Sequence, residues 1–155
     1  MPTADTWTIY LSGEIHSDWR QVIEDGIHAA SLPARCTSPV TDHDASDACG
    51  VAILGDEPDA FWHDHKGGKV NAIRTRSLIA DADIVVVRFG EKYRQWNAAF
   101  DAGYAAALGT PIITLHDPEL THALKEVDAA ALATAQHPEE VLGILRYVIT
   151  GTLAP

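Results

Sequence analysis

Residues 81–110, DADIVVVRFGEKYRQWNAAFDAGYAAALGT, decide the fold class of this chain. The run Ile84–Phe89 is almost entirely apolar, as in a strand that is buried on both faces of a sheet. The Ala-rich run Asn97–Leu108 predicts a following helix, and Gly109 is placed to end it as a C-cap. A buried strand, a polar turn and a helix in this order predict one repeat of an alternating β-α fold.

The same alternation continues on both sides of this stretch. The other expected strands are Trp7–Leu11, a weak one at Arg35–Val40, Pro111–Leu115 and Ala129–Thr134. The other expected helices are Trp19–Ala30, Asp59–His65, Val70–Ala80, His122–Val127 and Pro138–Ile149, whereas most of the polar stretch 41–68 fits no element. The pattern predicts a single α/β domain over residues 1–155, with a parallel sheet of about five strands and helices on both faces.

Composition and charge exclude several classes of partner. The chain has 155 residues with 46% hydrophobic and 21% charged side chains, as in globular proteins. Its 22 acidic and 11 basic residues give a net charge of −11, so we expect neither a nucleic acid polymer nor an anionic membrane surface as partner. One small anion held by local backbone donors is compatible with this charge.

Other sequence features bear on the location of the protein. No apolar run reaches the roughly 18 residues of a membrane-spanning helix, and the first residues lack the pattern of a signal peptide. The sequence therefore predicts a cytoplasmic protein. In that compartment Cys36 and Cys49 would be free thiols, with a single bridge between them as the alternative.

Parallel α/β sheets bind ligands at the carboxyl ends of their strands. The segments expected there are Ser12–Asp18, Asp42–Gly50, Arg88–Asn97 and His116–Asp117. Neither GxGxxG nor GxxxxGK[ST] occurs, so a dinucleotide fingerprint and a P-loop are absent. The Ser12–Gly13 turn could offer backbone N–H groups to an anion, or could be an ordinary tight turn.

The segment after the central strand holds the strongest candidate for chemistry. Asp101 lies early in its helix and shares one face with Tyr104, so it could act as nucleophile or general base, or could only stabilise the helix start. The basic residues Arg88, Lys92 and Arg94 could hold a phosphate or carboxylate, or form a solvated surface.

The stretches Asp42–Cys49 and Trp62–His65 are rich in His and Asp, yet contain neither HExxH nor CxxC. We expect no metal or other cofactor, and expect these side chains to line a polar pocket or to bind one another. A metal-dependent hydrolase built on His43, His63 and His65 is the third-ranked hypothesis. Trp62 could stack on a flat ligand, although a place in the core is more frequent for tryptophan.

Four stretches of this sequence resemble the YtoQ family. They are Tyr10–Arg20 (YLSGEIHSDWR), His43–Gly50 (HDASDACG), Asn71–Arg76 (NAIRTR) and Asp81–Thr110. YtoQ proteins are grouped with the nucleoside 2-deoxyribosyltransferase superfamily. The resemblance implies a flavodoxin-like or Rossmann-like sheet, a homodimer or higher homo-oligomer, and cleavage of the N-glycosidic bond of a small nucleoside or nucleotide by a carboxylate nucleophile.

The resemblance also implies roles for particular residues. Asp101 stands where the superfamily has its nucleophilic Glu, in the run Asp101–Ala105, and is one methylene shorter. The acid that assists departure of the base has no evident match, because Arg74–Arg76 stands at one expected place and Glu91 is the nearest carboxylate at the other. The catalytic candidates are Asp101, Glu91 and Tyr104, and the substrate-binding candidates are Tyr10, Ser12, Gly13, Glu14, Asp44, Arg74, Arg88, Trp96 and Asn97.

Two functions follow from these residues. The first is an enzyme that cleaves or transfers at the N-glycosidic bond, with Asp101 as nucleophile and either a second base or water as acceptor. The alternative is a module that binds a phosphorylated, nucleotide-like ligand without turnover. The missing acid favours this alternative, and the arginines favour an anionic ligand in both cases.

Overall fold

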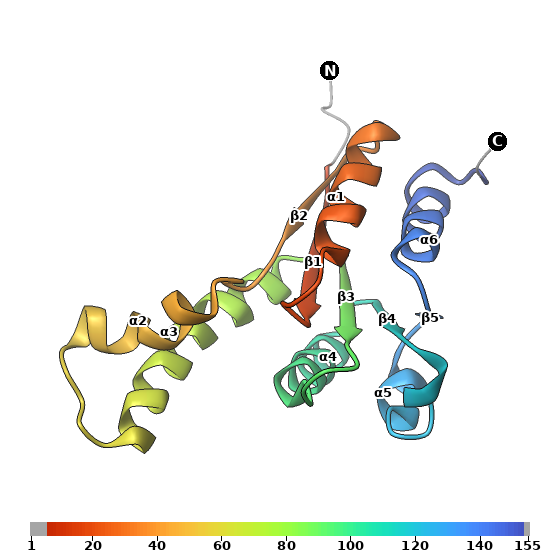
Figure 1. Ribbon diagram of the computed structural model, residues 1–155. Helices are drawn as coiled ribbons and strands as arrows, with labels where there is room; N and C mark the ends of the chain where they lie inside the picture. The colour runs from red at the N-terminus through yellow and green to blue at the C-terminus, as the bar shows by residue number, and fades with distance from the viewer. Residues whose placement is uncertain (1–5, 154–155) are drawn as a thin grey trace.

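Five strands form one parallel sheet in the order β2-β1-β3-β4-β5 in the computed structural model, which describes residues 6–153 (Figure 1). The strands are β1 (Trp7–Gly13), β2 (Ala34–Thr37), β3 (Ile84–Phe89), β4 (Ile112–His116) and β5 (Ala133–Ala135). All neighbouring pairs are parallel, which confirms the predicted sheet. The connection from β1 leads to β2 at one edge of the sheet, whereas the connection from β3 leads to β4 in the opposite direction. The topological switch point therefore lies between β1 and β3.

Residues 6–153 also form six helices and a short 3-10 turn, which connect the strands except for the last helix, which follows β5. They are α1 (Trp19–Ala29), α2 (His43–Leu54), α3 (Ala60–Ala80), α4 (Trp96–Leu108), the turn η1 (Pro118–Leu120), α5 (Lys125–Ala130) and α6 (Pro138–Thr150). The described residues include no helix long and apolar enough to cross a membrane. Cys36 and Cys49 are both free, as expected, and the alternative of a bridge between them is wrong.

The core has one apolar layer on each face of the sheet, because successive side chains of a strand point to opposite faces. Ile9 and Leu11 of β1 face α1 and α6, where they meet Ile23 and Leu145. Tyr10, between them, faces the opposite layer, which is formed by β3 residues together with α3, α4 and the segment around α5. The prediction of helices on both faces is therefore confirmed.

The stretch 41–68 differs from the sequence-based expectation. It forms α2 and the first part of α3, a helical hairpin that extends away from the sheet (Figure 1). The separate helices expected at Asp59–His65 and Val70–Ala80 are one helix of 21 residues that runs through Gly67 and Gly68. A Cβ on Gly50 of α2 would lie 2.3 Å from the backbone nitrogen of Gly67, so glycine at this crossing permits close helix packing instead of ending a helix.

The remaining differences concern element ends. β2 stops at Thr37, before Val40, and α5 begins at Lys125, because η1 and a turn precede it. Gly109 and Gly151 end α4 and α6 in the left-handed conformation, with φ of 77° and 71°, as C-cap glycines do.

Candidate functional site

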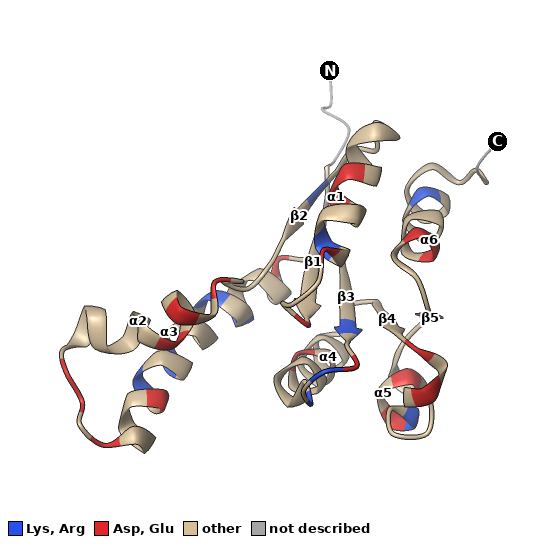
Figure 2. Cartoon of the chain, in the orientation of Figure 1, with Lys and Arg blue, Asp and Glu red and all other residues tan. Residues whose placement is uncertain are grey.

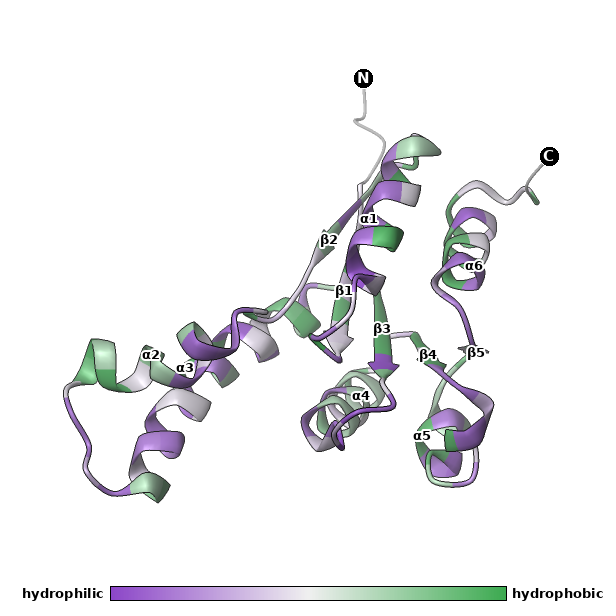
Figure 3. Ribbon diagram, in the orientation of Figure 1, coloured by the Kyte–Doolittle hydropathy of each residue, from purple (hydrophilic) through white to green (hydrophobic). Residues whose placement is uncertain are grey.

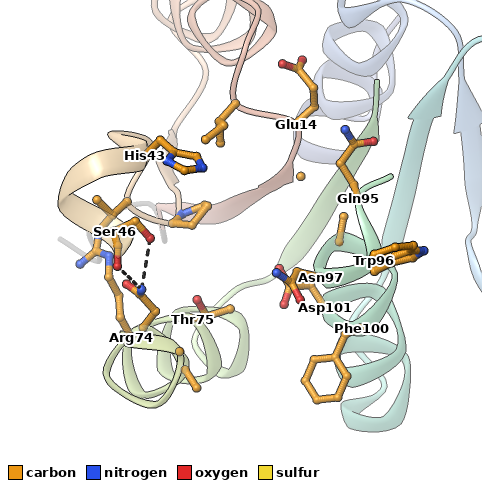
Figure 4. Close-up of a pocket in the computed structure, with 18 of the residues that line it drawn as sticks. Glu14, His43, Ser46, Arg74, Thr75, Gln95, Trp96, Asn97, Phe100 and Asp101 are labelled. Atoms are coloured by element: carbon orange, nitrogen blue, oxygen red, sulfur yellow. Dashed lines mark hydrogen bonds between the residues drawn. The ribbon is translucent and has the colours of Figure 1, made fainter. Parts of the chain in front are cut away.

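A cavity of about 960 Å³ lies at the carboxyl ends of β1 and β3, the switch point of the sheet (Figure 4). Its walls come from the turn after β1, from α2 and α3, and from α4 with the segment that precedes it. A volume of this size accommodates a molecule as large as a nucleotide. The position agrees with the prediction that ligands bind where the strands end.

Asp101 projects from α4 into this cavity (Figure 4). Its neighbours Ala98 and Ala102 are buried against the sheet, so the helix is anchored while Asp101 faces the opening. The hydroxyl of Ser12, fully buried at the end of β1, donates to Asp101 Oδ2 at 2.6 Å. Burial raises the pKa of Asp101, and the Ser12 hydrogen bond partly offsets this rise.

The phenol of Tyr10 is buried close behind Asp101. Burial and the charge of Asp101 raise its pKa to about 12, although Thr75, Arg20 and Arg74 act in the opposite direction. The hydroxyl therefore stays protonated, and no residue of the described chain accepts its hydrogen bond. Tyr10 thus holds an unused donor behind the wall of the cavity.

Gly13 allows β1 and β3 to approach each other at the edge of the cavity. Its φ is +110°, and a Cβ at this position would lie 2.1 Å from the carbonyl oxygen of Arg88. The next residue, Glu14, donates its backbone N–H to that same carbonyl at 3.1 Å. Only glycine tolerates both the positive φ and the close approach to Arg88, which explains why a glycine follows Ser12.

The carboxylate of Glu14 is 6% exposed and held from several sides. It accepts hydrogen bonds from the backbone of His16 and from the Ser17 hydroxyl, and Arg88 Nε lies 3.5 Å away. Burial alone would raise the pKa of Glu14, but these hydrogen bonds and the charge of Arg88 together lower it. Glu14 is therefore an ionised, fixed carboxylate at the cavity wall.

Arg20 holds the turn that follows β1 in place through hydrogen bonds, a role that the sequence analysis missed. Its guanidinium donates to the carbonyl oxygens of Leu11, Gly13 and Glu14 at 3.1, 3.0 and 2.6 Å. Burial lowers the pKa of Arg20 to about 10, so the group is still charged near neutral pH. An arginine in the first turn of a helix opposes the helix dipole, and this unfavourable placement is the signal that could have revealed it.

Aromatic side chains form one side of the opening. Trp96 and Phe100 of α4 line the cavity and are 73% and 60% exposed, so each leaves an apolar face uncovered (Figure 4). Exposed rings of this kind can stack on a flat, partly apolar ligand such as a nucleobase. Trp96 was expected at the site, whereas Phe100 was not.

The cavity collects most of the residues expected from the sequence. Gly13, Glu14, Arg74, Trp96, Asn97, Asp101 and Tyr104 all line it. Tyr10, Ser12 and Arg88 lie behind the lining: Ser12 reaches Asp101, and Arg88 faces Glu14.

Two expected site residues lie elsewhere. The carboxyl of Glu91 is exposed beside Asp117, whose hydrogen bond and charge raise its pKa, and it does not line the cavity. Asp44 is fully exposed, because its position in α2 turns it away, and the cavity is lined by its neighbours His43, Ser46 and Asp47. The sequence analysis placed them by chain position alone, which does not give side-chain direction.

The end of β4 does not contribute to the cavity. His116 is 1% exposed, with Nδ1 2.7 Å from the carbonyl oxygen of Asp117 and Nε2 2.9 Å from Asp128 Oδ2. Asp128 also accepts from the Thr114 hydroxyl at 2.8 Å. These contacts fasten α5 to β4, so the expectation of a ligand at His116–Asp117 is wrong for His116.

The residues of the His- and Asp-rich stretches contribute mainly to the structure of α2 and α3. Asp42 and Asp59 accept hydrogen bonds from the first backbone N–H groups of α2 and α3. Within residues 6–153 no three metal-binding side chains come together. Trp62 is 51% exposed against Phe61 and His65, so it lies neither in the core nor at the cavity.

The sheet order and the cavity at its switch point define a doubly wound α/β protein with a small-molecule-sized site. Two solved structures share this fold. A conserved protein from Enterococcus faecalis V583 is 13% identical with a TM-score of 0.63, over 93% of this chain and 99% of that one. A 2-deoxyribosyltransferase from Bacillus psychrosaccharolyticus is 17% identical with a TM-score of 0.52, over 87% and 90%.

Sequence comparison identifies the family. The profile of the family described as "Nucleoside 2-deoxyribosyltransferase YtoQ" matches residues 10–149. The uncharacterized protein YtoQ of Bacillus subtilis (strain 168) is 41% identical over 140 residues, which are 90% of this chain and 95% of that protein. The chain therefore belongs to the YtoQ family, and the resemblance seen in the sequence is confirmed.

Proposed function

We propose that this protein cleaves the N-glycosidic bond of a 2'-deoxynucleoside-type substrate and transfers the deoxyribosyl group. The observation that carries the proposal is the half-buried Asp101 carboxylate, held by Ser12 at 2.6 Å and open to the cavity. Membership of the YtoQ family supports it, because the family description names this activity.

The chemistry would proceed in two displacements. An oxygen of Asp101 attacks the anomeric carbon, the C–N bond breaks, and the base leaves with the bonding electron pair and gains a proton. A second base, or water, then attacks the same carbon and gives up one proton, which balances the proton gained by the first base, and the bond to Asp101 breaks, which regenerates the carboxylate. Attack requires the reacting atoms to come within about 3–3.5 Å, so the shorter Asp side chain demands a sugar bound deep in the cavity.

Ser12 would prepare Asp101 for attack. Its hydrogen bond to Oδ2 fixes the carboxylate and leaves Oδ1 without a hydrogen bond among the described residues. Because burial raises the pKa of Asp101, the ionised form is a stronger base and nucleophile than an exposed aspartate. The base would stack against the exposed rings of Trp96 and Phe100, which belong to the same helix as Asp101.

A non-catalytic binding protein is the second candidate, and one observation favours it. Glu14 is a second, buried carboxylate at the cavity wall, but its lowered pKa keeps it ionised, so it has no proton to give to a departing base. Glu91, the other candidate for this role, lies outside the cavity. Turnover would need a proton from a neutral donor or from water.

A base-release assay separates the two candidates. Wild-type protein would be incubated with 2'-deoxynucleosides and their monophosphates, with and without a second base, and the products separated by chromatography. We expect free base, a new nucleoside when the second base is present, and loss of both in Asp101→Ala. The matched control is Asp25→Ala, an exposed carboxylate of α1. Ligand that binds but stays intact under all conditions would refute the enzyme and favour the binding protein.

A homo-oligomer also remains a prediction, as does the cytoplasmic location. Figure 3 shows hydrophobic segments at the tip of the α2–α3 hairpin. Ile53, Leu54 and Phe61 of this hairpin are exposed by 68%, 60% and 66%. We propose that a second copy of this chain covers them. Light scattering would show a dimer or larger assembly for the wild type and a smaller species for Ile53→Asp, whereas a monomeric wild type would contradict the proposal.

A further inference from the structure

We infer that the substrate of this cavity carries a phosphate group, held by Arg74, Arg76 and Arg94, so that the protein acts on a 2'-deoxynucleoside monophosphate in preference to the uncharged nucleoside. The inference rests on the proposed function for the nucleoside part of the ligand. The phosphate itself is argued from the charges around the cavity.

Three arginines line the cavity of a chain that has twice as many acidic as basic residues. Arg74 and Arg76 belong to α3, and Arg94 belongs to the segment before α4. Figure 2 shows basic segments on α3 and next to α4. Within residues 6–153, none of the three has a carboxylate within 4.0 Å. Three cations without a carboxylate partner in such an acidic protein favour an anion from outside the chain.

No acidic residue of the cavity lining forms an ion pair with these arginines. Asp47 lies 3.3 Å from His43, and Asp64 lies 3.5 Å from His63. Asp101 accepts from Ser12, and Glu14 is held by the turn 14–17 and by Arg88. Each carboxylate of the cavity therefore has a contact of its own, and the guanidinium groups remain available.

The structure also says where the phosphate cannot lie. The turn after β1 was the place at which the sequence analysis allowed an anion on backbone donors. The carboxylate of Glu14 already accepts the hydrogen bonds of His16 N–H and Ser17 Oγ–H there. A phosphate at this turn would lose those donors and meet a like charge, so the arginines of α3 and of the segment before α4 are the remaining cations for it in the cavity lining.

The two arginines of α3 flank Thr75, and the charge of Arg74 reaches the buried Tyr10 behind Asp101, where it lowers the pKa of the phenol. Thr75 lies between Arg74 and Arg76, and its side chain lowers the pKa of the buried Tyr10 beside Asp101. At about 100° per residue, Arg74 and Arg76 leave α3 about 200° apart, on either side of Thr75, and both line the cavity. Arg74 gives one N–H to the carbonyl oxygen of Ser38 at 3.2 Å, and its other donors are free for the paired hydrogen bonds that phosphate accepts.

Binding to a catalytically silenced protein tests the inference. Titration calorimetry on Asp101→Asn would compare 2'-deoxynucleosides, their 5'- and 3'-monophosphates, and inorganic phosphate. We expect a monophosphate to bind at least about tenfold more tightly than its nucleoside. Each of Arg74→Gln, Arg76→Gln and Arg94→Gln should weaken the monophosphate by about tenfold and the nucleoside by less than about twofold. The control is Arg146→Gln on α6, away from the cavity.

The outcomes separate the phosphate from the proposed chemistry. Equal affinity for nucleoside and monophosphate, equal losses for both in the arginine variants, or no binding of either would overturn the inference. Inorganic phosphate that binds as tightly as the nucleotide would also overturn it, because the site would then take free phosphate. Base release from nucleosides and monophosphates at equal rates would refute the preference for a phosphate but support the proposed enzymatic activity. Selective binding of the monophosphate without base release would support the phosphate site and refute the enzymatic activity.

Discussion

Gly13→Ala tests the local geometry on which the cavity depends. The new Cβ would stand 2.1 Å from the carbonyl oxygen of Arg88 and 2.9 Å from its carbonyl carbon. Both are backbone atoms of β3, the neighbouring strand, so no side chain can move aside to relieve the contact. The two strands would have to separate by about 1 Å at the point where Ser12 and Glu14 are positioned, in an interior that is packed closely.

The expected loss of stability combines two effects. A residue other than glycine at φ of +110° costs about 1–3 kcal/mol. Separation of the strands adds lost packing and a weakened hydrogen bond from Glu14 N–H to Arg88, for a total of about 3 kcal/mol or more. For a chain of 155 residues this lowers the melting temperature by about 6–12 °C.

Thermal unfolding followed by circular dichroism measures this loss. The matched control is Gly143→Ala in α6, where an added Cβ meets nothing within 4 Å and helix propensity should raise the stability by about 0.5–1 kcal/mol. A Gly13→Ala protein that melts within about 2 °C of the wild type would refute the close approach of β1 to β3.

Three further substitutions test the site. Because burial raises the pKa of Asp101, its ionisation costs stability, and this cost disappears as pH falls through that pKa. Asp101→Asn should therefore raise the melting temperature at pH 8 and give no such increase in acid. A lower melting temperature than that of the wild type at every pH would contradict this. Tyr10→Phe removes a hydroxyl without a partner, so it should change the stability by less than about 1 kcal/mol, and a larger loss in urea unfolding would reveal a hidden hydrogen bond. Arg20→Gln removes charged hydrogen bonds to three carbonyl groups and should cost about 2–4 kcal/mol in the same assay, whereas an unchanged midpoint would refute its role under the turn.

The fold was largely predictable because its signals are local. The apolar run Ile84–Phe89 and the Ala-rich helix that follows reveal themselves by composition, and the strand and helix types recur in the structure. The hairpin of α2 and α3 was missed for a physical reason. Gly67 and Gly68 resemble helix breakers in sequence, but Gly67 serves a contact with Gly50 that only the folded chain creates.

The position of the site at the strand ends was predictable from the sequence, but which side chains enter it was less so. Glu14 directly follows β1, Asp101 lies in the helix that follows β3, and both reach the cavity. Glu91 and Asp44 lie closer to a strand end in sequence than Asp101 does, yet turn away, because a turn or a helix position decides the direction of each side chain. Arg20 acts through three carbonyl groups, a type of contact that has no sequence pattern of its own.

The central claim is that Asp101 becomes covalently bound to the sugar, and mass spectrometry tests this most directly. The protein would be incubated with a 2'-fluorinated deoxynucleoside monophosphate, whose fluorine slows the second displacement, and then quenched in acid. We predict a mass increase of one sugar phosphate, located on the peptide that carries Asp101 and absent from Asp101→Asn. Release of base by the wild type with the adduct on another residue, or at an undiminished rate in Asp101→Asn, would contradict the claim.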